Sequence, residues 1–347
     1  MKLLILGGTR FLGRHVVDAA LARGDRVTLF TRGRQPNHWG DAVATVTGNR
    51  DPAVEPGLSS LATGTWDAVI DTCGYVPRVV RASAELLAPR VGRYLFVSSI
   101  SVFTDASRPG LDESSPVGVL EDPATEEVGK HYGPLKAACE DVVTEIFGDR
   151  ALNVRPGLIV GPHDPTDRFG YWVARFVHPR LLGDRADRAV VPLPRERPLQ
   201  WIDARDLAAF MLDLVAAGAA GTYNATSPAG QWTMATLVDA LTNAGGAAAP
   251  AVAWTDEATL IERKVEPWTG LPLWIPTSFA DEAGFMAIDC GKAHAAGLRT
   301  RPLAGTIAET AAWLAQRDNA AAWKDVLTAD AEREILAAGG GAGAGTS

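Results

Sequence analysis

The chain has 347 residues, of which 47% are hydrophobic and 21% are charged. This length and composition exclude a disordered protein and predict two domains, or one large domain with insertions. The net charge of −8 disfavours a protein that coats nucleic acid or an anionic membrane, so we expect neither as a partner. Three widely spaced cysteines indicate neither a disulfide framework nor a metal site, and no stretch approaches about 20 apolar residues. We therefore expect a soluble, cytoplasmic protein that holds no metal.

Short apolar runs alternate with amphipathic stretches over the first half of the chain. The runs predict strands at residues 3–6, 27–30, 42–47, 68–71, 94–98 and 152–155. The amphipathic stretches predict helices at residues 11–23, 79–87 and 135–147. Strands that are apolar on both faces fit a parallel sheet covered by helices on each side. The predicted fold class is therefore α/β, a doubly wound Rossmann-type sheet with a smaller C-terminal module that covers the substrate.

The composition changes after about residue 157. Proline-rich stretches at 192–198 and 267–276 alternate with predicted helices, and eight of the ten tryptophans lie beyond residue 170. The helices are expected at residues 204–216, 233–244, 303–316 and 320–338. We predict a nucleotide-binding Rossmann domain over 1–156, a mixed substrate-binding region with returning Rossmann elements over 157–338, and a flexible tail over 339–347.

A glycine-rich turn follows the first predicted strand directly and opens the first helix. Backbone amides and the positive end of a helix dipole form a pyrophosphate site in this context, and a Cβ would keep the backbone away from the phosphates. The alternative is an ordinary tight turn. The predicted cofactor contacts are Gly7, Gly8, Thr9, Arg10, Phe11, Leu12 and Gly13.

The choice of cofactor depends on the residues after the second strand, where an acidic side chain would hold the ribose hydroxyls of NAD. This chain has Arg32 and Arg34 there and no Asp or Glu. Guanidinium groups match a 2′-phosphate, and Arg10 adds a third positive group. We therefore expect NADP(H). NAD(H) is the alternative, because an arginine-rich chain places arginine on many loops.

Tyr132 and Lys136 lie four residues apart, and Pro134 places Tyr132 at or just before the first turn of its helix. A nearby cation would lower the pKa of the phenol and allow it to exchange a proton with a carbonyl or hydroxyl. Ser98 and Ser99 end the fifth predicted strand, at the edge where doubly wound sheets bind ligands. A serine there can orient a substrate oxygen, or it can satisfy local backbone groups.

These motifs, together with residues 155–157 and 201–208, resemble the extended short-chain dehydrogenase/reductase superfamily, the NAD(P)-dependent epimerase/dehydratase group. The resemblance implies that Ser99 orients the substrate, Tyr132 is the acid/base and Lys136 anchors the ribose. It further implies cofactor contacts at Asn49, Arg50, Thr72, Cys73, Gly74 and Pro156.

The chain departs from that family's pattern at several positions. Arg10 replaces a glycine of the turn, and Arg78 or Val79 stands where many members carry an asparagine of the proton relay. Leu199 occupies the place of an arginine that grips the diphosphate of a sugar nucleotide, and Arg197 is out of register. The absence of that arginine argues against a sugar-nucleotide substrate without excluding it.

We expect an oxidoreductase that transfers hydride between NADP(H) and a carbonyl or alcohol of a small metabolite. The alternatives are a sugar-nucleotide epimerase or dehydratase, and a non-catalytic cofactor-sensing or RNA-associated protein. His163, Asp112 and Glu113 are candidate further acid/base groups, or loop and capping residues. An aromatic or apolar substrate pocket, or simply a core, is expected from Tyr171, Trp172, Trp201, Trp254, Trp268, Trp274 and Phe279.

Overall fold

The computed structural model describes residues 1–318 and 321–339. Apart from residue 339, the predicted tail over 339–347 lies outside the described residues. The described chain contains a seven-stranded parallel sheet in the order β11-β6-β5-β4-β1-β2-β3. Its strands are β1 (Lys2–Leu6), β2 (Arg26–Thr31), β3 (Val43–Thr47), β4 (Trp66–Asp71), β5 (Val91–Val97), β6 (Ala151–Pro156) and β11 (Gly221–Ala225). The predicted α/β fold class is confirmed.

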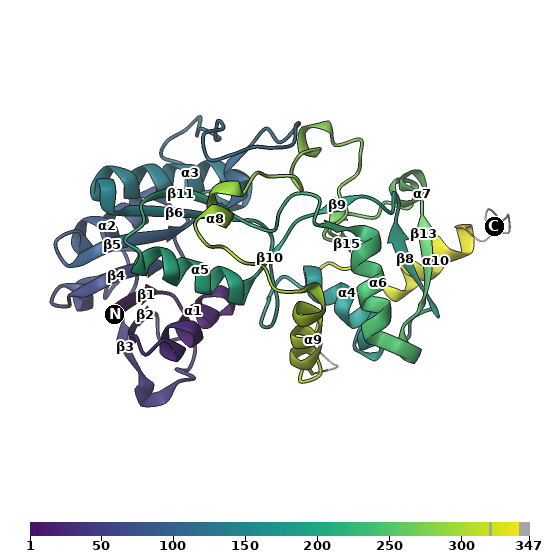
Figure 1. Cartoon of the computed structure of the whole chain (residues 1–347), viewed down its shortest axis with the longest axis horizontal. Helices are drawn as coiled ribbons and strands as arrows, with labels where there is room; N and C mark the ends of the chain where they lie inside the picture. Colours follow the sequence, from purple (N-terminus) through teal and green to yellow (C-terminus); the bar gives the residue numbers. More distant parts are fainter. Residues whose placement is uncertain (319–320, 340–347) are drawn as a thin grey trace.

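Two helical layers cover the sheet (Figure 1). On one face α1 (Phe11–Ala22) packs against α5 (Ala204–Ala216), and on the other α2 (Pro77–Leu87) packs against α3 (Val128–Phe147). Helices cover both faces because the strands are apolar on both sides. In β1, Leu3 and Ile5 belong to the core under α1 and α5, whereas Leu4 and Leu6 belong to the core under α2 and α3. All four leucine and isoleucine side chains are fully buried, which stabilises the fold by about 1.5–3 kcal/mol each.

The remaining elements form a second lobe, on the right in Figure 1. Its core contains the buried side chains Phe169, Trp172, Leu237 and Trp274. Its helices are α4 (Arg168–Val177), α6 (Met234–Gly245), α7 (Glu257–Glu262), α9 (Leu303–Leu314) and α10 (Ala329–Gly339). Its paired strands are β8 (Arg188–Pro192) with β13 (Ala251–Thr255), and β14 (Pro267–Trp268) with β15 (Leu271–Pro272).

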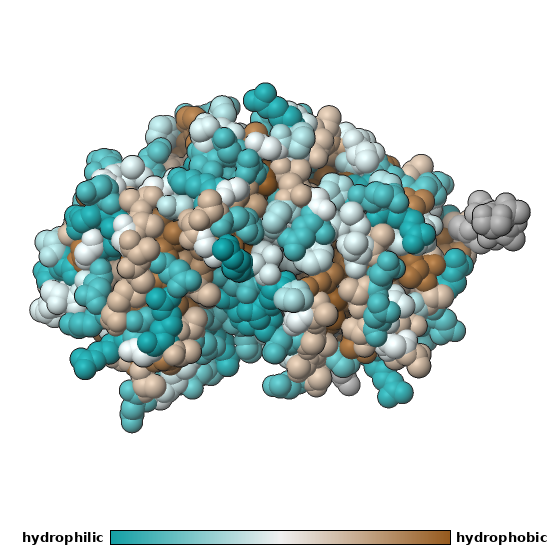
Figure 2. All heavy atoms as spheres, in the orientation of Figure 1, coloured by the Kyte–Doolittle hydropathy of each residue, from teal (hydrophilic) through white to brown (hydrophobic). Residues whose placement is uncertain are grey.

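Short segments connect the two parts of the molecule. Strand β7 (Ile159–Val160) pairs with β10 (Ile202–Asp203), β9 (Pro198–Leu199) pairs with β12 (Trp232–Thr233), and α8 (Gly291–Ala295) packs beside β11. On the face seen in Figure 2, hydrophilic side chains cover most of the surface and hydrophobic ones form small separate patches. Within the described residues, none of the helices is both long and apolar enough to cross a membrane.

Several elements differ from the sequence-based expectations, among them β11, α4 and residues 321–328. Strand β11 was not expected, because its sequence contains glycine and asparagine, which are poor strand formers. Helix α4 was not expected either. Residues 321–328 belong to no helix, although a helix was expected over 320–338; residue 320 lies outside the described residues. Tertiary contacts hold this segment, since the Leu327 amide donates to the Gly270 carbonyl at 2.6 Å.

Candidate functional site

A cavity of about 1320 Å³ lies at the carboxyl ends of β1, β2, β4 and β5, and residues of the second lobe contribute to its wall. Every predicted cofactor contact except Gly74 lines this cavity, as do Ser99, Tyr132 and Lys136. The structure therefore brings the glycine turn, Ser99, Tyr132 and Lys136 together around one space. Carboxyl ends of parallel strands are where doubly wound sheets bind their ligands.

The glycine turn approaches its neighbours so closely that side chains would not fit. A Cβ on Gly7, whose φ is +95°, would lie 2.7 Å from Thr72 Oγ1. A Cβ on Gly13 would lie 2.5 Å from the Gly8 Cα atom, so helix α1 can start against the turn only with glycine there. No side chain caps the N-terminus of α1. The turn therefore has the bare backbone and open amides that a dinucleotide pyrophosphate requires.

Three arginines of the cavity wall have no partner within the described part of the chain. Arg32 and Arg34 follow the end of β2, and Arg10 lies in the glycine turn; all three side chains are exposed. The acidic residue of this wall, Asp51, is held by Arg78 at 2.9 Å, which lowers its pKa to about 2. The unpaired guanidinium groups fit a phosphate monoester better than a ribose diol.

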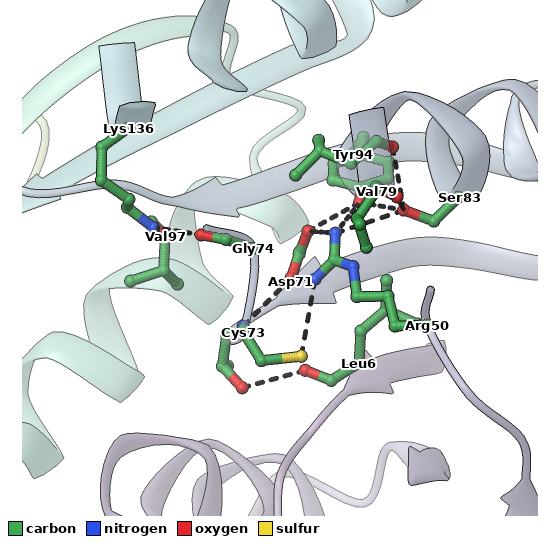
Figure 3. A network of polar contacts seen from close by, with 12 residues as sticks. Leu6, Arg50, Asp71, Cys73, Gly74, Val79, Ser83, Tyr94, Val97 and Lys136 are labelled. Atoms are coloured by element: carbon green, nitrogen blue, oxygen red, sulfur yellow. Dashed lines mark hydrogen bonds and ion pairs between the residues drawn. The ribbon is translucent and has the colours of Figure 1, made fainter. Parts of the chain in front are cut away.

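Arg50 and Asp71 form an ion pair beneath the cavity (Figure 3). Both terminal nitrogens of Arg50 donate to the Asp71 carboxylate, which also accepts from the Tyr94 hydroxyl at 2.8 Å and the Cys73 amide at 3.1 Å. Burial acts to raise the pKa of Asp71, but the charge of Arg50 and these hydrogen bonds lower it below its ordinary value. The pair ties the loop after β3 to the end of β4. The predicted cofactor contact of Arg50 stays a prediction.

Lys136 is buried behind the cavity, and its ammonium group donates to the carbonyls of Gly74 at 2.7 Å and Val97 at 2.5 Å (Figure 3). Burial lowers its pKa to about 8. Helix α3 has a non-helical residue at His131, so its regular turns begin at Tyr132, as Pro134 indicates. Gly74, although absent from the wall, thus contributes by fixing Lys136.

Tyr132 keeps 36% of its surface exposed, within the cavity. The protein around the cavity withdraws the hydroxyl from bulk water and raises its pKa, while the nearby Ser99 hydroxyl and the Arg168 guanidinium act in the opposite direction. Without a bound cofactor, burial outweighs these two contributions, so the pKa of the phenol lies above its ordinary value. The cation that acts on Tyr132 is Arg168, not Lys136. Ser99 also satisfies local groups, because its Oγ accepts from the Ser101 amide at 3.1 Å.

Sequence reasoning identified only part of the wall that the second lobe contributes. Of the seven aromatic candidates, Trp268 lines the cavity, whereas Tyr171, Trp172 and Trp274 are fully buried in the core. Missed residues include Thr166, Arg168 and Phe285. No local pattern singles them out, since they come from loops and a helix start that tertiary packing brings to the cavity.

The other candidate acid/base groups lie outside the cavity wall. The His163 ring packs between His15 and Trp313, with ring centres 5.9 and 5.7 Å away. Asp112 accepts a hydrogen bond from the Ser114 hydroxyl at 2.7 Å, and Glu113 accepts from the Asn224 amide at 2.7 Å. Each of these residues therefore has a structural role.

Several solved structures share the fold of this chain. The Bordetella bronchiseptica enzyme WbmH in complex with NAD+ is 18% identical, with a TM-score of 0.64 over 91% of this chain and 98% of that one. UDP-glucuronic acid 4-epimerase from Bacillus cereus in complex with NAD is 13% identical, with a TM-score of 0.63 over 93% and 99%. The human epimerase family protein SDR39U1 (isoform 2) with NADPH is 19% identical, with a TM-score of 0.58 over 90% and 99%.

The chain thus has the fold of the NAD-dependent epimerase/dehydratase group, which the resemblance in its sequence implied. No protein-family model matches the sequence. Among curated proteins, it is 26% identical over 183 residues to chloroplast stem-loop binding protein of 41 kDa b from Arabidopsis thaliana, a match that covers 48% of this chain and 45% of that protein. The name of this relative does not support our expectation that nucleic acid is excluded as a partner.

Proposed function

We propose that this protein binds NADP(H) in the cavity and transfers hydride between it and a carbonyl or alcohol group of a small metabolite. The observation that carries the proposal is that the Tyr132 phenol, the Ser99 hydroxyl and the bare glycine turn line the same cavity. Such a cavity combines a proton donor with a binding site for the dinucleotide that supplies the hydride, and carbonyl reduction needs both.

The backbone of Gly7, Gly8 and Gly13 would hold the pyrophosphate, and Arg32 with Arg34 would hold the 2′-phosphate. When bound, NADPH supplies the hydride. The protein supplies the proton: because the pKa of Tyr132 is raised, its phenol stays protonated at neutral pH and can donate to a carbonyl oxygen.

Ser99 and Lys136 support the phenol in different ways. The Ser99 hydroxyl, near Tyr132, can donate to the same substrate oxygen and hold it in place. Lys136 fixes the back of the cavity, because its ammonium joins the loop after β4 to the end of β5 through two carbonyls. Contact between Lys136 and the ribose is part of the proposal.

The reaction is tested by substituting the phenol. Tyr132→Phe should lower the rate of NADPH-dependent reduction by about 100- to 10,000-fold, the usual contribution of a positioned general acid. The matched control is Tyr223→Phe, which removes a hydroxyl from β11, away from the cavity wall. Equal rates for wild type and Tyr132→Phe would contradict the proposed role.

The cofactor preference is tested by fluorescence titration. NADPH should bind more tightly than NADH, and Arg32→Ala combined with Arg34→Ala should remove most of the difference, since two charge-assisted hydrogen-bonding groups are lost. Arg26→Ala, at an exposed β2 position outside the cavity wall, is the matched control. Equal affinities of the unmodified protein for the two cofactors would refute the preference.

A sugar-nucleotide epimerase or dehydratase is the second candidate. It is favoured by the fold shared with the UDP-glucuronic acid 4-epimerase from Bacillus cereus. In such an enzyme the hydride returns to the same substrate, so the cofactor stays bound and is not consumed. Stoichiometric NADPH oxidation during turnover supports the reductase, whereas interconversion of a sugar nucleotide without net oxidation supports the epimerase.

A non-catalytic, RNA-associated protein is the third candidate, and the name of the Arabidopsis relative favours it. Binding of a stem-loop RNA that Tyr132→Phe leaves unchanged, together with no turnover of any carbonyl by the wild type, would support this candidate over the other two.

A further inference from the structure

Arg168 begins helix α4 and reaches into the cavity from the second lobe. Its Nε donates to Thr166 Oγ1 at 3.1 Å, and its guanidinium carbon lies 5.2 Å from the centre of the Trp268 ring. The Trp268 ring packs edge-on against Phe285, 5.7 Å away. One aromatic wall therefore supports a positive group whose two terminal nitrogens have no hydrogen-bond partner among the described residues.

Arg168 differs from the arginines that are buried in this chain. Arg155 is paired with Glu140 at 2.6 Å, Arg175 is paired with Glu332 at 3.1 Å, and Arg197 is paired with Glu257 at 3.3 Å. Arg168 is half-buried and forms no ion pair within residues 1–318 and 321–339. A partly desolvated cation without an ion-pair partner costs free energy, so a function that keeps it in place is expected to supply an anion.

Neither nearby carboxylate pairs with Arg168: Asp167, which directly precedes it, is paired with Arg317 at 2.6 Å, and Asp164 is hydrogen-bonded to Thr166. The Oδ1 atom of Asp164 accepts from the Thr166 amide at 2.9 Å and from the Thr166 hydroxyl at 2.6 Å. Burial raises the pKa of Asp164, which weakens the charge that it presents to Arg168. Asp164 instead orients Thr166, which in turn fixes Arg168 Nε. The two terminal nitrogens stay available.

We propose that Arg168 is an anion subsite, which binds a carboxylate or phosphate group of the substrate while the Trp268–Phe285 wall packs against its apolar body. Arg168 and Tyr132 line the same cavity. The inference rests on the proposed function, because it identifies the substrate as an anionic oxo or hydroxy compound whose reacting oxygen lies at Tyr132.

Binding of simple probes tests the subsite directly, by calorimetry, with and without NADPH. Benzoate and phenyl phosphate carry the two anions on one ring, and benzamide is the neutral counterpart. Arg168→Gln should weaken binding of the preferred anion by about 10- to 100-fold, the range for charge-assisted hydrogen bonds, and leave benzamide unchanged. Arg168→Lys should retain only part of the wild-type affinity for this anion, because an ammonium group lacks the planar pair of donors.

The matched control is Arg180→Gln, which removes an exposed arginine of the same lobe outside this cavity. It should leave all three affinities unchanged. The inference is overturned if the wild type binds neither anion more tightly than benzamide, or if Arg168→Gln binds both anions as well as the wild type. Whichever of the two anions binds more tightly identifies the group that Arg168 recognises as a carboxylate or a phosphate.

Thermal stability separates this role from a structural one. A cation in the first turn of a helix opposes the helix dipole, and the Arg168 side chain makes a single hydrogen bond among the described residues, so Arg168→Gln should melt at or above the wild-type temperature. Melting several degrees lower would indicate a structural role and overturn the inference. Anion binding that depends on Arg168 in a protein that does not bind NADPH would refute the proposed function and leave the subsite standing.

Discussion

Asp71→Asn tests the contribution of the Arg50–Asp71 ion pair, which lies beneath the cavity, to the stability of the fold. Asp71 is fully buried and neutralises Arg50, so the substitution leaves the guanidinium without a counter-charge in the protein interior. Removing one partner of a buried ion pair costs about 3–5 kcal/mol of unfolding free energy. We expect a loss of this size at pH 7, measured by urea unfolding.

Two further variants sharpen that measurement. Arg50→Met combined with Asp71→Asn should be more stable than Asp71→Asn alone, because no uncompensated charge remains. The matched control is Asp213→Asn, in an exposed pair with Arg23 at 2.7 Å, which should change stability by less than about 1 kcal/mol. A loss below about 1 kcal/mol for Asp71→Asn, or a double variant less stable than the single one, would refute the reasoning.

The same pair predicts a pH dependence. The pKa of Asp71 is lower in the folded chain than in the unfolded chain, where it is about 3.9. Its stabilisation is therefore complete above the unfolded pKa and is lost as the pH falls through the folded value. The stability difference between wild type and Asp71→Asn should be constant from about pH 7 to pH 5 and should shrink below about pH 4.

Gly13→Ala should weaken NADPH binding at least about tenfold in a fluorescence titration, since its Cβ would meet Gly8 Cα at 2.5 Å and displace the turn; affinity within twofold of wild type would contradict this. Glu332→Gln should destabilise the second lobe by about 3–5 kcal/mol in urea, because it leaves the buried Arg175 unpaired, and a loss below about 1 kcal/mol would argue against it. The rate of carbonyl reduction should fall only as the pH rises through the raised pKa of Tyr132, above about 10; a fall centred below about pH 8 would exclude the phenol as the acid.

Local patterns predict the sheet domain well, because its strands and turns depend on neighbours in sequence. The alternation of buried faces in β1 and the close approach at Gly13 both follow from residue types at fixed spacing. Strand β11 escaped prediction because pairing with β6, not its own composition, makes it a strand.

The substrate side of the cavity could not be predicted in the same way. Arg168 stands beside Trp268 although 100 residues separate them, and Phe285 completes the wall from a further segment. Such contacts leave no periodic signal. The raised pKa of Tyr132 could not be predicted for the same reason. The sequence shows the spacing between Tyr132 and Lys136, but it shows neither the burial of the phenol nor the position of Arg168.

Transfer of isotope tests the central claim most directly. The protein is incubated with NADPH that carries deuterium at the transferable position of its nicotinamide and with a panel of small oxo acids and phosphorylated carbonyl compounds, and the products are analysed by mass spectrometry. The account predicts that the wild type yields an alcohol carrying one deuterium and that Tyr132→Phe yields almost none. Equal labelling by both proteins, or NADPH bound by the wild type with no label passing to any compound of the panel, would contradict it.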